Sequence, residues 1–299
     1  MRPIDITILT DQNNLIKSVS SRESSTGYIE DALLQKAFED SGLTVMRKAW
    51  DDPLFDWSTT RLIIFRSTWD YFYRFNEFNS WLDKVSQQTQ LINSSKLIQW
   101  NVDKHYLKDL ENNGVHIVES HFIEQGTTST LSQIHNKLGW NKTVLKPCIS
   151  GTARHTYVID QSNINDYELE FKGLIKNESF LLQPFQESIL SRGEVSIIII
   201  NGHFTHAILK LAKFGDFRVQ GDFGGTYTSY QPTPQEIKFA EKTIKACNEQ
   251  PVYARVDIIT DNSGNIALTE LELVEPELWF RENNNAAKLL SKAIKSIYF

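Results

Sequence analysis

The chain has 299 residues, of which 40% are hydrophobic and 11% aromatic, and its formal net charge is -6 at pH 7. This composition excludes a disordered chain, and the length allows a large core divided into two or three lobes. The acidic balance gives no general attraction to nucleic acid or to an anionic membrane, so neither is an expected partner.

The cysteines and the amino-terminal residues favour a cytoplasmic protein. Cys148 and Cys247 lie far apart in the sequence, so a disulfide framework is not expected and a reducing compartment is favoured. The opening residues, MRPIDITILT, contain an apolar run that is short and interrupted by Asp5. They predict a buried strand, and they are too short for a signal peptide or a membrane span.

Strand-like and helix-like patterns alternate at the start of the chain. The expected strands are residues 4–10, 43–49 and 61–67, and the expected helices are residues 27–42 and 75–88. Such alternation is typical of βαβ units, so the pattern predicts a small α/β first lobe.

Polar and aromatic residues follow the strand at 61–67 and are candidates for contact with a substrate. They are Arg66, Ser67, Thr68, Trp69 and Asp70. Open α/β sheets bind ligands at the carboxyl ends of their strands, which favours a ligand-binding segment here. Ser67 or Thr68 would serve equally well as a helix cap, because caps use the same residue types. The sequence leaves both interpretations open.

Two lysines stand where an anion could bind. Lys104 falls near the start of a predicted helix, an unfavourable place for a cation against the helix dipole. Lys146 ends an apolar strand and precedes a loop of small residues, Ser150, Gly151 and Thr152. Small loop residues let backbone N–H groups approach phosphate oxygens. Exposed lysines explain each pattern taken alone, and the chain contains neither GxxxxGK[ST] nor GxGxxG.

The following strands carry two further signals. Pro184 interrupts the predicted strand SFLLQPFQES and frees backbone groups beside Gln183 and Phe185. A strongly apolar strand, EVSIIII, begins at Glu194 and turns at Asn201-Gly202 into a predicted hairpin.

The last predicted hairpin gathers acidic residues. The segments VYARVDII and NIALTELEL alternate apolar and polar residues, which predicts two strands joined by a two-residue turn at Ser263-Gly264. This register sets Asp257 opposite Glu270 and Arg255 opposite Glu272, all on one face. Directly opposed carboxylates repel each other, so the arrangement calls for a cation between them.

Two interpretations of this acidic face stay open on the hairpin alone. In the first, Arg255 pairs with Glu272 and water screens the remaining charges. In the second, the carboxylates form a divalent metal site of hard oxygen ligands. A shift of one residue in register would turn the whole set to the other face.

The order of these features is more specific than any one of them. The quoted motifs are RSTWDY, WNVDKHYL, VLKPCISGTARHTY, FRVQGDFGGTY and LTELELVEPELWF. Over nearly its whole length the chain resembles the ATP-grasp superfamily of carboxylate–amine ligases. Within it, the motifs look like the branch that contains D-cycloserine synthetase and neighbours prokaryotic glutathione synthetase.

The resemblance implies an α/β fold with α+β lobes. Its expected parts are a Rossmann-like α/β pre-ATP-grasp domain at residues 1–98, a central ATP-grasp lobe at residues 99–185, and a carboxyl-terminal ATP-grasp lobe with the metal site at residues 186–299.

The resemblance also implies which residues bind ATP. They are Lys104 and Lys146 for the phosphates, Ser150, Gly151 and Thr152 for a closing loop, Gln183, Pro184 and Phe185 for the adenine edge, and Glu194 for the ribose. The loop has one glycine where many relatives have more, so its closure is expected to depend on small neighbouring residues.

Further residues are implied for the metal, for catalysis and for the substrate. Asp257, Glu270 and Glu272 match the ligands of Mg²⁺, for which Mn²⁺ is an alternative, and Glu272 stands where several relatives carry asparagine. Arg218 and Arg255 match arginines that offset the developing negative charge. The expected substrate segments are residues 66–71, 218–227 and 275–280. Within them the expected substrate residues are Arg66, Ser67, Thr68, Trp69, Asp70, Gly224, Gly225 and Glu275.

The implied reaction joins a carboxylate to an amine through an acyl phosphate. Its substrate is expected to be a small amino-acid-like molecule, and its product an amide, a peptide or a ring. The alternatives are a ligase that adds an amino acid to a peptide or protein terminus, and a nucleotide-binding sensor without catalysis. The habit of the superfamily suggests a homodimer.

Overall fold

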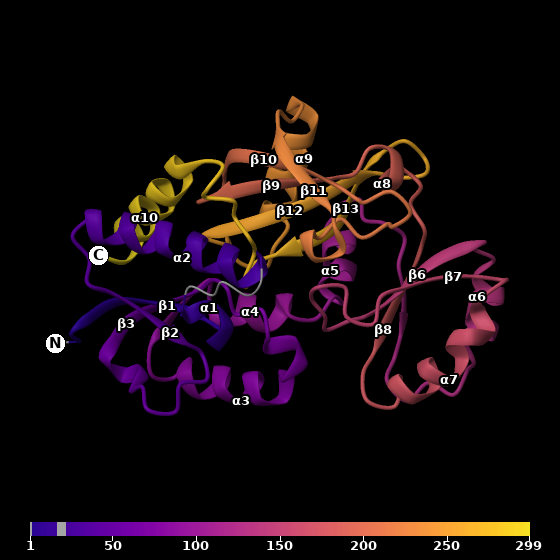
Figure 1. The fold of residues 1–299 in the computed structure, drawn as a ribbon, viewed down its shortest axis with the longest axis horizontal. Coiled ribbons are helices and arrows are strands. Elements are labelled where there is room, and N and C mark those ends of the chain that lie inside the picture. The colour runs from indigo at the N-terminus through magenta and orange to yellow at the C-terminus, as the bar shows by residue number, and fades with distance from the viewer. Residues whose placement is uncertain (1, 17–21) are drawn as a thin grey trace.

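The computed structural model describes residues 2–16 and 22–299, which form three lobes built on separate sheets (Figure 1). The first lobe has a parallel sheet in the order β2-β1-β3-β4. Its strands are β1 (Ile4–Thr10), β2 (Val45–Ala49), β3 (Thr60–Phe65) and β4 (Gln90–Ile92). The α/β prediction for this part of the chain is confirmed.

Helices cover both faces of the first sheet because its strands are apolar on both sides. The elements are α1 (Gln12–Leu15), α2 (Arg22–Asp40), α3 (Phe75–Val85) and the 3₁₀ turns η1 (Trp57–Thr59) and η2 (Tyr71–Tyr73). Ile6 and Ile8 pack in the core with α2 and with the final helix of the chain, α10 (Asn284–Tyr298). Leu9 and Ile63 face the opposite core, which contains α3. The helix expected from residue 27 begins earlier, at Arg22.

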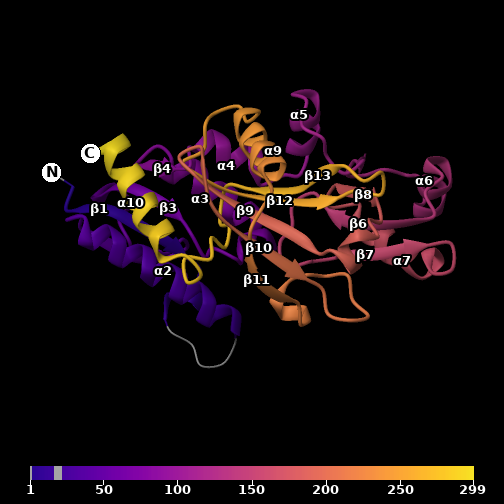
Figure 2. The same cartoon turned by 90° about the horizontal axis from the view of Figure 1, so that it is seen from above.

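The middle lobe is a small antiparallel sheet in the order β5-β8-β6-β7. Its elements are β5 (His121–Ile123), α6 (Leu131–Leu138), β6 (Lys142–Pro147), β7 (Tyr157–Asp160), α7 (Ile164–Leu174) and β8 (Phe180–Pro184). Helices α6 and α7 pack together with the strands around one core. This lobe projects to one side of the molecule in both views (Figure 1, Figure 2).

The third lobe is an antiparallel sheet in the order β11-β10-β9-β12-β13. Its elements are α8 (Ser188–Ser191), β9 (Glu194–Ile200), β10 (His203–Leu211), the 3₁₀ turn η3 (Gly221–Phe223), β11 (Thr226–Tyr230), α9 (Pro234–Lys245), β12 (Tyr253–Thr260) and β13 (Ile266–Glu272). The chain then crosses back, so that α10 lies beside α2 on the first lobe (Figure 1, Figure 2).

Helices α4 (Ser95–Asn101) and α5 (Tyr106–Asn112) pack on the large third sheet. The Asn101 side chain bonds to the backbone of Leu271 and Leu273 at 2.8 and 2.7 Å, and the Leu271 N–H donates to the Tyr106 hydroxyl at 2.9 Å. The lobe boundaries at residues 98 and 185 stay a prediction. Ile117 also bridges to Leu268, and the Val118 N–H donates to the Leu268 carbonyl at 3.1 Å, so we propose that the central lobe begins after residue 118.

The predicted register of the acidic hairpin is confirmed, although its predicted turn is wrong. Asp257 pairs with Glu270 and Arg255 with Glu272. The turn holds three residues, 262–264, because the Asp261 N–H bonds to the Asn265 carbonyl. A bulge at Thr269 then adds one residue to β13, which restores the register expected from the shorter turn.

A second bulge sets the register of β9 and β10. His203 pairs with Ile200 as the Asn201-Gly202 turn predicts, but the register shifts by one residue between Phe204 and His206. Lys210 consequently lies opposite Glu194. Without the bulge Lys210 would face the other side of the sheet.

Among the described residues, no helix is long and apolar enough to cross a membrane.

Candidate active site

A cavity of about 370 Å³ lies where the three lobes meet. It gathers all the predicted ATP, metal and catalytic residues, which are far apart in sequence. These are Lys104, Lys146, Ser150, Gly151, Thr152, Gln183, Pro184, Phe185, Glu194, Arg218, Arg255, Asp257, Glu270 and Glu272.

Three carboxylates converge at one end of this cavity. Asp257, Glu270 and Glu272 each offer an oxygen atom within 4.8 Å of the others. Asp257 is buried, and the two glutamates are half-buried. Hard oxygen ligands in this arrangement fit a divalent cation of the Mg²⁺ type.

Two basic side chains stabilise the ionised form of Asp257. Arg255 Nη2 lies 2.8 Å and Lys210 Nζ 3.1 Å from Asp257 Oδ2, and the Ser196 hydroxyl donates to Oδ1 at 2.6 Å. Burial alone would raise the pKa of Asp257, but Arg255 and Lys210 hold it well below its usual range. Asp257 is therefore an anion at neutral pH.

The two glutamates differ in their proton affinity. Glu270 pairs with Lys104 at 2.9 Å. Burial opposes ionisation of Glu270, yet Lys104 and Lys146 keep its pKa below the usual value. Burial raises the pKa of Glu272 to about 8; its partner Arg255 opposes this rise, and the nearby carboxylates Glu270 and Asp257 add to it. A divalent cation would favour the ionised form of Glu272.

Lys146 is the cation of this site that has no protein partner. Among the residues that the structure describes, none forms a hydrogen bond or ion pair with its ammonium group. Burial lowers the pKa of Lys146, which Glu270 only partly offsets. An unpaired ammonium in a cavity wall is suited to an anionic ligand.

The loop after β6 presents backbone donors to the same space. Within the described ranges, the N–H groups of Gly151, Thr152 and Ala153 bond to no other residue. Thr152 and Ala153 have left-handed backbones, with φ of 46° and 55°. Consecutive N–H groups turned in this way form a concave binding place for anions, typically phosphates.

Gly151 fits its position because Phe72 of the first lobe packs against the loop. A Cβ atom at residue 151 would lie 2.4 Å from Phe72 Cε1. Overpacking of this kind costs about 1–3 kcal/mol. We expect Gly151→Ala to displace the loop and to raise KM for ATP by ~10-fold, as measured from initial rates of ADP release.

A matched control and a rescue accompany this variant. Gly173 lies in α7, and a Cβ atom added there would meet no other atom within 4 Å, so Gly173→Ala should leave KM unchanged. Adding Phe72→Ala to Gly151→Ala should restore part of the affinity. An unchanged KM in Gly151→Ala would contradict the phosphate role of the loop.

The linker after β8 has backbone groups that can bind a ligand, but they belong to Pro184 and Gln186, whereas the prediction named Gln183, Pro184 and Phe185. The Phe185 N–H already bonds to the Lys142 carbonyl at 2.9 Å. The Pro184 carbonyl accepts only from the Gln186 side chain, and the Gln186 N–H has no partner among the described residues. Pro184 and Gln186 therefore offer the acceptor and donor that an adenine edge needs.

The two predicted catalytic arginines have different surroundings. Arg255 is buried between Asp257 and Glu272, two of the three predicted metal ligands. Arg218 lines the cavity from the loop after β10, where its Nη2 pairs with Asp216 at 2.7 Å and its guanidinium stacks on Phe223. Asp216 occupies Nε and Nη2 of Arg218, which leaves Nη1 for a further contact.

The predicted substrate residues divide into two groups. Trp69, Gly225 and Glu275 line the cavity. Trp69 donates through Nε1 to the Glu275 carbonyl at 3.0 Å, which joins the first lobe to the segment after β13. Burial raises the pKa of Glu275 to about 7, so part of its population is neutral at physiological pH.

The other predicted substrate residues are not part of the cavity wall. These are Arg66, Ser67, Thr68, Asp70 and Gly224. Arg66 is buried and donates to the Pro276 carbonyl at 2.7 Å, Ser67 bonds to the buried Asp31, and Asp70 accepts from Trp50 at 2.7 Å. Residues 66–70 lie at the predicted sheet edge, but the side chains of Arg66, Ser67 and Asp70 turn into the protein. Gly224 lies elsewhere, in the loop between η3 and β11. Direct contact with a substrate is not supported by these positions.

Sequence reasoning missed several residues of the cavity. Lys210 forms ion pairs with Glu194 at 2.5 Å and with Asp257 at 3.1 Å. The sequence did not predict that Lys210 faces the cavity, because the bulge in β10 reverses the direction of the side chains that follow it. Glu277 and Arg281 line the far end and pair with each other at 2.6 Å. Glu277 falls within the predicted substrate segment 275–280, whereas Arg281 lies one residue beyond it and was missed.

Two protein families match successive segments of the chain. Residues 6–93 match the family described as D-cycloserine synthetase DcsG, N-terminal domain, and residues 114–290 match the RimK-like ATP-grasp domain. The cycloserine biosynthesis protein DcsG of Streptomyces lavendulae is 26% identical over 277 residues, covering 87% of this chain and 91% of that protein.

Two solved structures have the same fold. The crystal structure of D-cycloserine synthetase DcsG has a TM-score of 0.86 at 24% identity, covering 98% of this chain and 99% of the other. The ATP-grasp ligase PsnB, complexed with precursor peptide PsnA2 and AMPPNP, has a TM-score of 0.62 at 13% identity, covering 100% and 99%.

The fold and the family match define an ATP-grasp protein. The chain belongs to the RimK-like ATP-grasp family, whose domain accounts for residues 114–290. It is an ATP-dependent carboxylate–amine ligase that forms a carbon–nitrogen bond, and its cofactors are ATP and a divalent metal ion. The fold class predicted from the resemblance is confirmed.

Proposed function

We propose that this ligase activates the carboxylate of a small amino-acid-like substrate as an acyl phosphate and couples it to an amine. One observation carries the proposal: the unpaired Lys146 and the free N–H groups after β6 share a cavity with three converging carboxylates. An anion-binding half facing a cation-binding half suits a metal–nucleotide complex.

We assign the binding of ATP to residues from two lobes. Lys104, Lys146 and the loop Ser150–Thr152 hold the phosphates. The adenine edge lies against Gln183, Pro184 and Phe185, with Gln186 as an added donor, and Glu194 holds the ribose. Asp257, Glu270 and Glu272 hold Mg²⁺, which when bound neutralises phosphate charge.

In the proposed reaction a substrate carboxylate oxygen attacks the γ-phosphorus of ATP, and ADP leaves. The amine then attacks the acyl carbon, phosphate leaves with the C–O bond pair, and the amine gives up a proton. Lys146, Arg218 and Arg255 offset the charge on the transferred group. Because the groups act by position and charge, no protein nucleophile is required.

The far end of the cavity supports a zwitterionic substrate. Glu277 supplies an anion, and Arg281 Nη2 has no hydrogen-bond partner among the described residues. A carboxylate on Arg281 and an ammonium on Glu277 match the two ends of an amino acid. The relative from Streptomyces lavendulae is named for cycloserine biosynthesis, which agrees with a substrate of this size.

The test is ADP release with a panel of D- and L-amino acids, alone and with amines. We expect release that requires both ATP and a carboxylate substrate, and hydroxylamine should trap the acyl phosphate as a hydroxamate. Chelation of the metal should stop release, and added Mg²⁺ should restore it. ATP binding without any substrate-stimulated ADP would instead support a nucleotide sensor.

A peptide-directed ligase is the second candidate, because PsnB was solved with a precursor peptide. The same panel, extended with short peptides, separates the two: stimulation by peptides alone would overturn the small-substrate proposal. We place the reaction in the cytoplasm because ATP is supplied there. A homodimer stays a prediction.

A further inference from the structure

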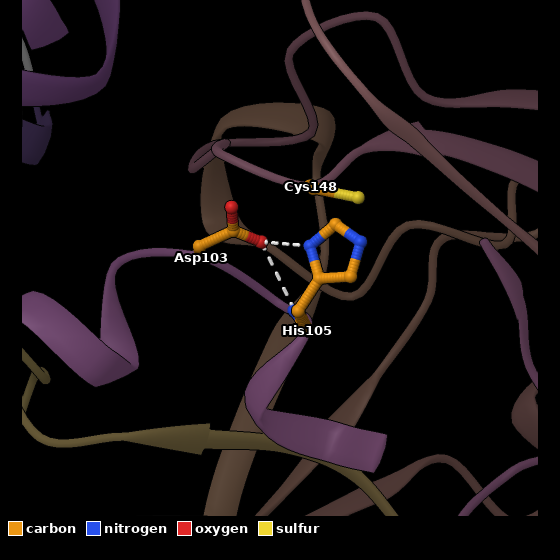
Figure 3. A group of neighbouring side chains, drawn as sticks. All are labelled: Asp103, His105 and Cys148. Carbon is orange, nitrogen blue, oxygen red and sulfur yellow. Dashed lines mark hydrogen bonds and ion pairs between the residues drawn. The ribbon is translucent and has the colours of Figure 1, made fainter. Parts of the chain in front are cut away.

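A cluster of three different ligand types lies outside the wall of the nucleotide cavity. Asp103 and His105 precede α5, and Cys148 follows β6. Their ligand atoms all lie within 4.8 Å of one another. Figure 3 shows the Asp103 carboxylate directed at the His105 ring and the Cys148 side chain beside the same ring. Oxygen, nitrogen and sulfur are thus brought together from two separate parts of the chain.

The imidazole of His105 is held in place on both sides. Nδ1 lies 2.6 Å from Asp103 Oδ1, and Nε2 lies 3.2 Å from a carboxylate oxygen of Glu124. The ring also stacks on Phe122, with centroids 4.5 Å apart. Asp103 and Glu124 therefore fix the orientation of the ring from opposite edges.

The Cys148 thiol is buried and free. It is 1% exposed, is not in a disulfide, and forms no hydrogen bond with the residues that the structure describes. The second cysteine, Cys247, contacts the Thr243 carbonyl of its own helix end instead. Packing alone explains a buried thiol, but not its position against an imidazole and a carboxylate.

We propose that Asp103, His105 and Cys148 bind a borderline-soft divalent cation of the Zn²⁺ class, with water as the fourth ligand. Zn²⁺ takes sulfur, nitrogen and oxygen at about 2.0–2.3 Å, so its tetrahedral ligands lie roughly 3.5 Å apart. The 2.6 Å contact between Asp103 Oδ1 and His105 Nδ1 has to open by roughly 1 Å to admit the ion, and rotation of these two partly exposed side chains can supply this.

Mg²⁺ is not the ion for this site. It is a hard cation that keeps oxygen ligands and water, whereas sulfur and imidazole select Zn²⁺ and similar metals. The carboxylates of the nucleotide cavity have the opposite preference. Two sites of different chemistry therefore lie on either side of one short segment.

The cluster is linked to the ATP site through Lys104. The Lys104 N–H donates to the Cys148 carbonyl at 2.9 Å, and its ammonium contacts the Ser150 carbonyl at 3.1 Å and Glu270 at 2.9 Å. A metal that joins Asp103 and His105 to Cys148 fixes the backbone on both sides of this lysine. Binding of a metal to this cluster is therefore expected to change how Lys104 contacts the phosphates of ATP.

Cobalt absorption tests the sulfur ligand directly. The protein is loaded with Co²⁺ in excess Mg²⁺, which keeps the carboxylate site filled, and the near-ultraviolet sulfur-to-cobalt charge-transfer band is recorded. We expect a band at one equivalent that Zn²⁺ abolishes, that Cys148→Ser removes, and that the matched control Cys247→Ser retains. Absence of the band, its persistence in Cys148→Ser, or its loss in Cys247→Ser overturns the proposal.

A second variant covers the case in which Cys148→Ser does not fold. His105→Gln changes a partly exposed side chain, so its fold should be retained, as checked by circular dichroism. We expect His105→Gln to weaken Zn²⁺ binding by at least ~10-fold in competition with a chromophoric chelator. Equal affinity in the wild-type protein and in His105→Gln would rule the site out.

Discussion

Glu270→Gln is expected to lower the rate of ADP release by at least ~100-fold at saturating substrates, the scale of losing a major electrostatic element. The amide cannot supply the negative charge that a divalent cation requires. It also leaves Lys104 without its partner at 2.9 Å. Asp257→Asn is expected to have an effect at least as large, because Asp257 is the most buried of the three carboxylates.

The two variants differ in what else they disturb. Asp257 is the partner of both Arg255 and Lys210, so Asp257→Asn leaves two buried cations poorly paired, whereas Glu270→Gln affects one. Thermal unfolding and circular dichroism should therefore accompany the rate measurements. Glu111→Gln, on the exposed face of α5, is the matched control and should keep full turnover. Near-normal turnover in both site variants would refute the metal assignment.

Lys210→Met is expected to destabilise the protein by about 3–5 kcal/mol, since it removes one partner from a buried charge cluster. Lys210 bridges Glu194 and Asp257 at 2.5 and 3.1 Å. Burial alone would lower the pKa of Lys210, but the two carboxylates raise it, so the lost group is a cation. Its removal leaves two buried anions facing each other.

Urea unfolding with and without Mg²⁺ measures this effect. Added Mg²⁺ should recover more stability in Lys210→Met than in the wild-type protein, because the ion replaces part of the missing charge. The double variant Lys210→Met with Asp257→Asn should be more stable than Lys210→Met alone, since it removes the charge of one of the two carboxylates that Lys210 bridged. Lys213→Met, at an exposed lysine three residues later, serves as the control. A loss no larger than in the control would mean that Lys210 does not hold the carboxylates.

The substrate end of the site was the least predictable part. Arg66, Ser67 and Asp70 lie at the carboxyl end of β3 as predicted, but sequence position does not fix side-chain direction. Burial of Arg66 beneath Pro276 depends on the final crossing segment, and bonding of Asp70 to Trp50 depends on a residue that precedes β3. Glu277 and Arg281 enter the wall only because the crossing segment returns to the first lobe.

The sequence alone determined the strand patterns, the acidic pair Asp257 and Glu270, and the order of lysine, loop and linker, because each rests on local periodicity and residue chemistry. It also supported the family, which residues 114–290 confirm. The tertiary structure alone decided where β-bulges interrupt the alternation of side chains along the strands. The bulge at Thr269 offset a longer turn and kept the acidic pair together, while the bulge in β10 turned Lys210 into the site. One inserted residue reverses every side chain beyond it, and its cost is balanced by packing against strands that are distant in sequence.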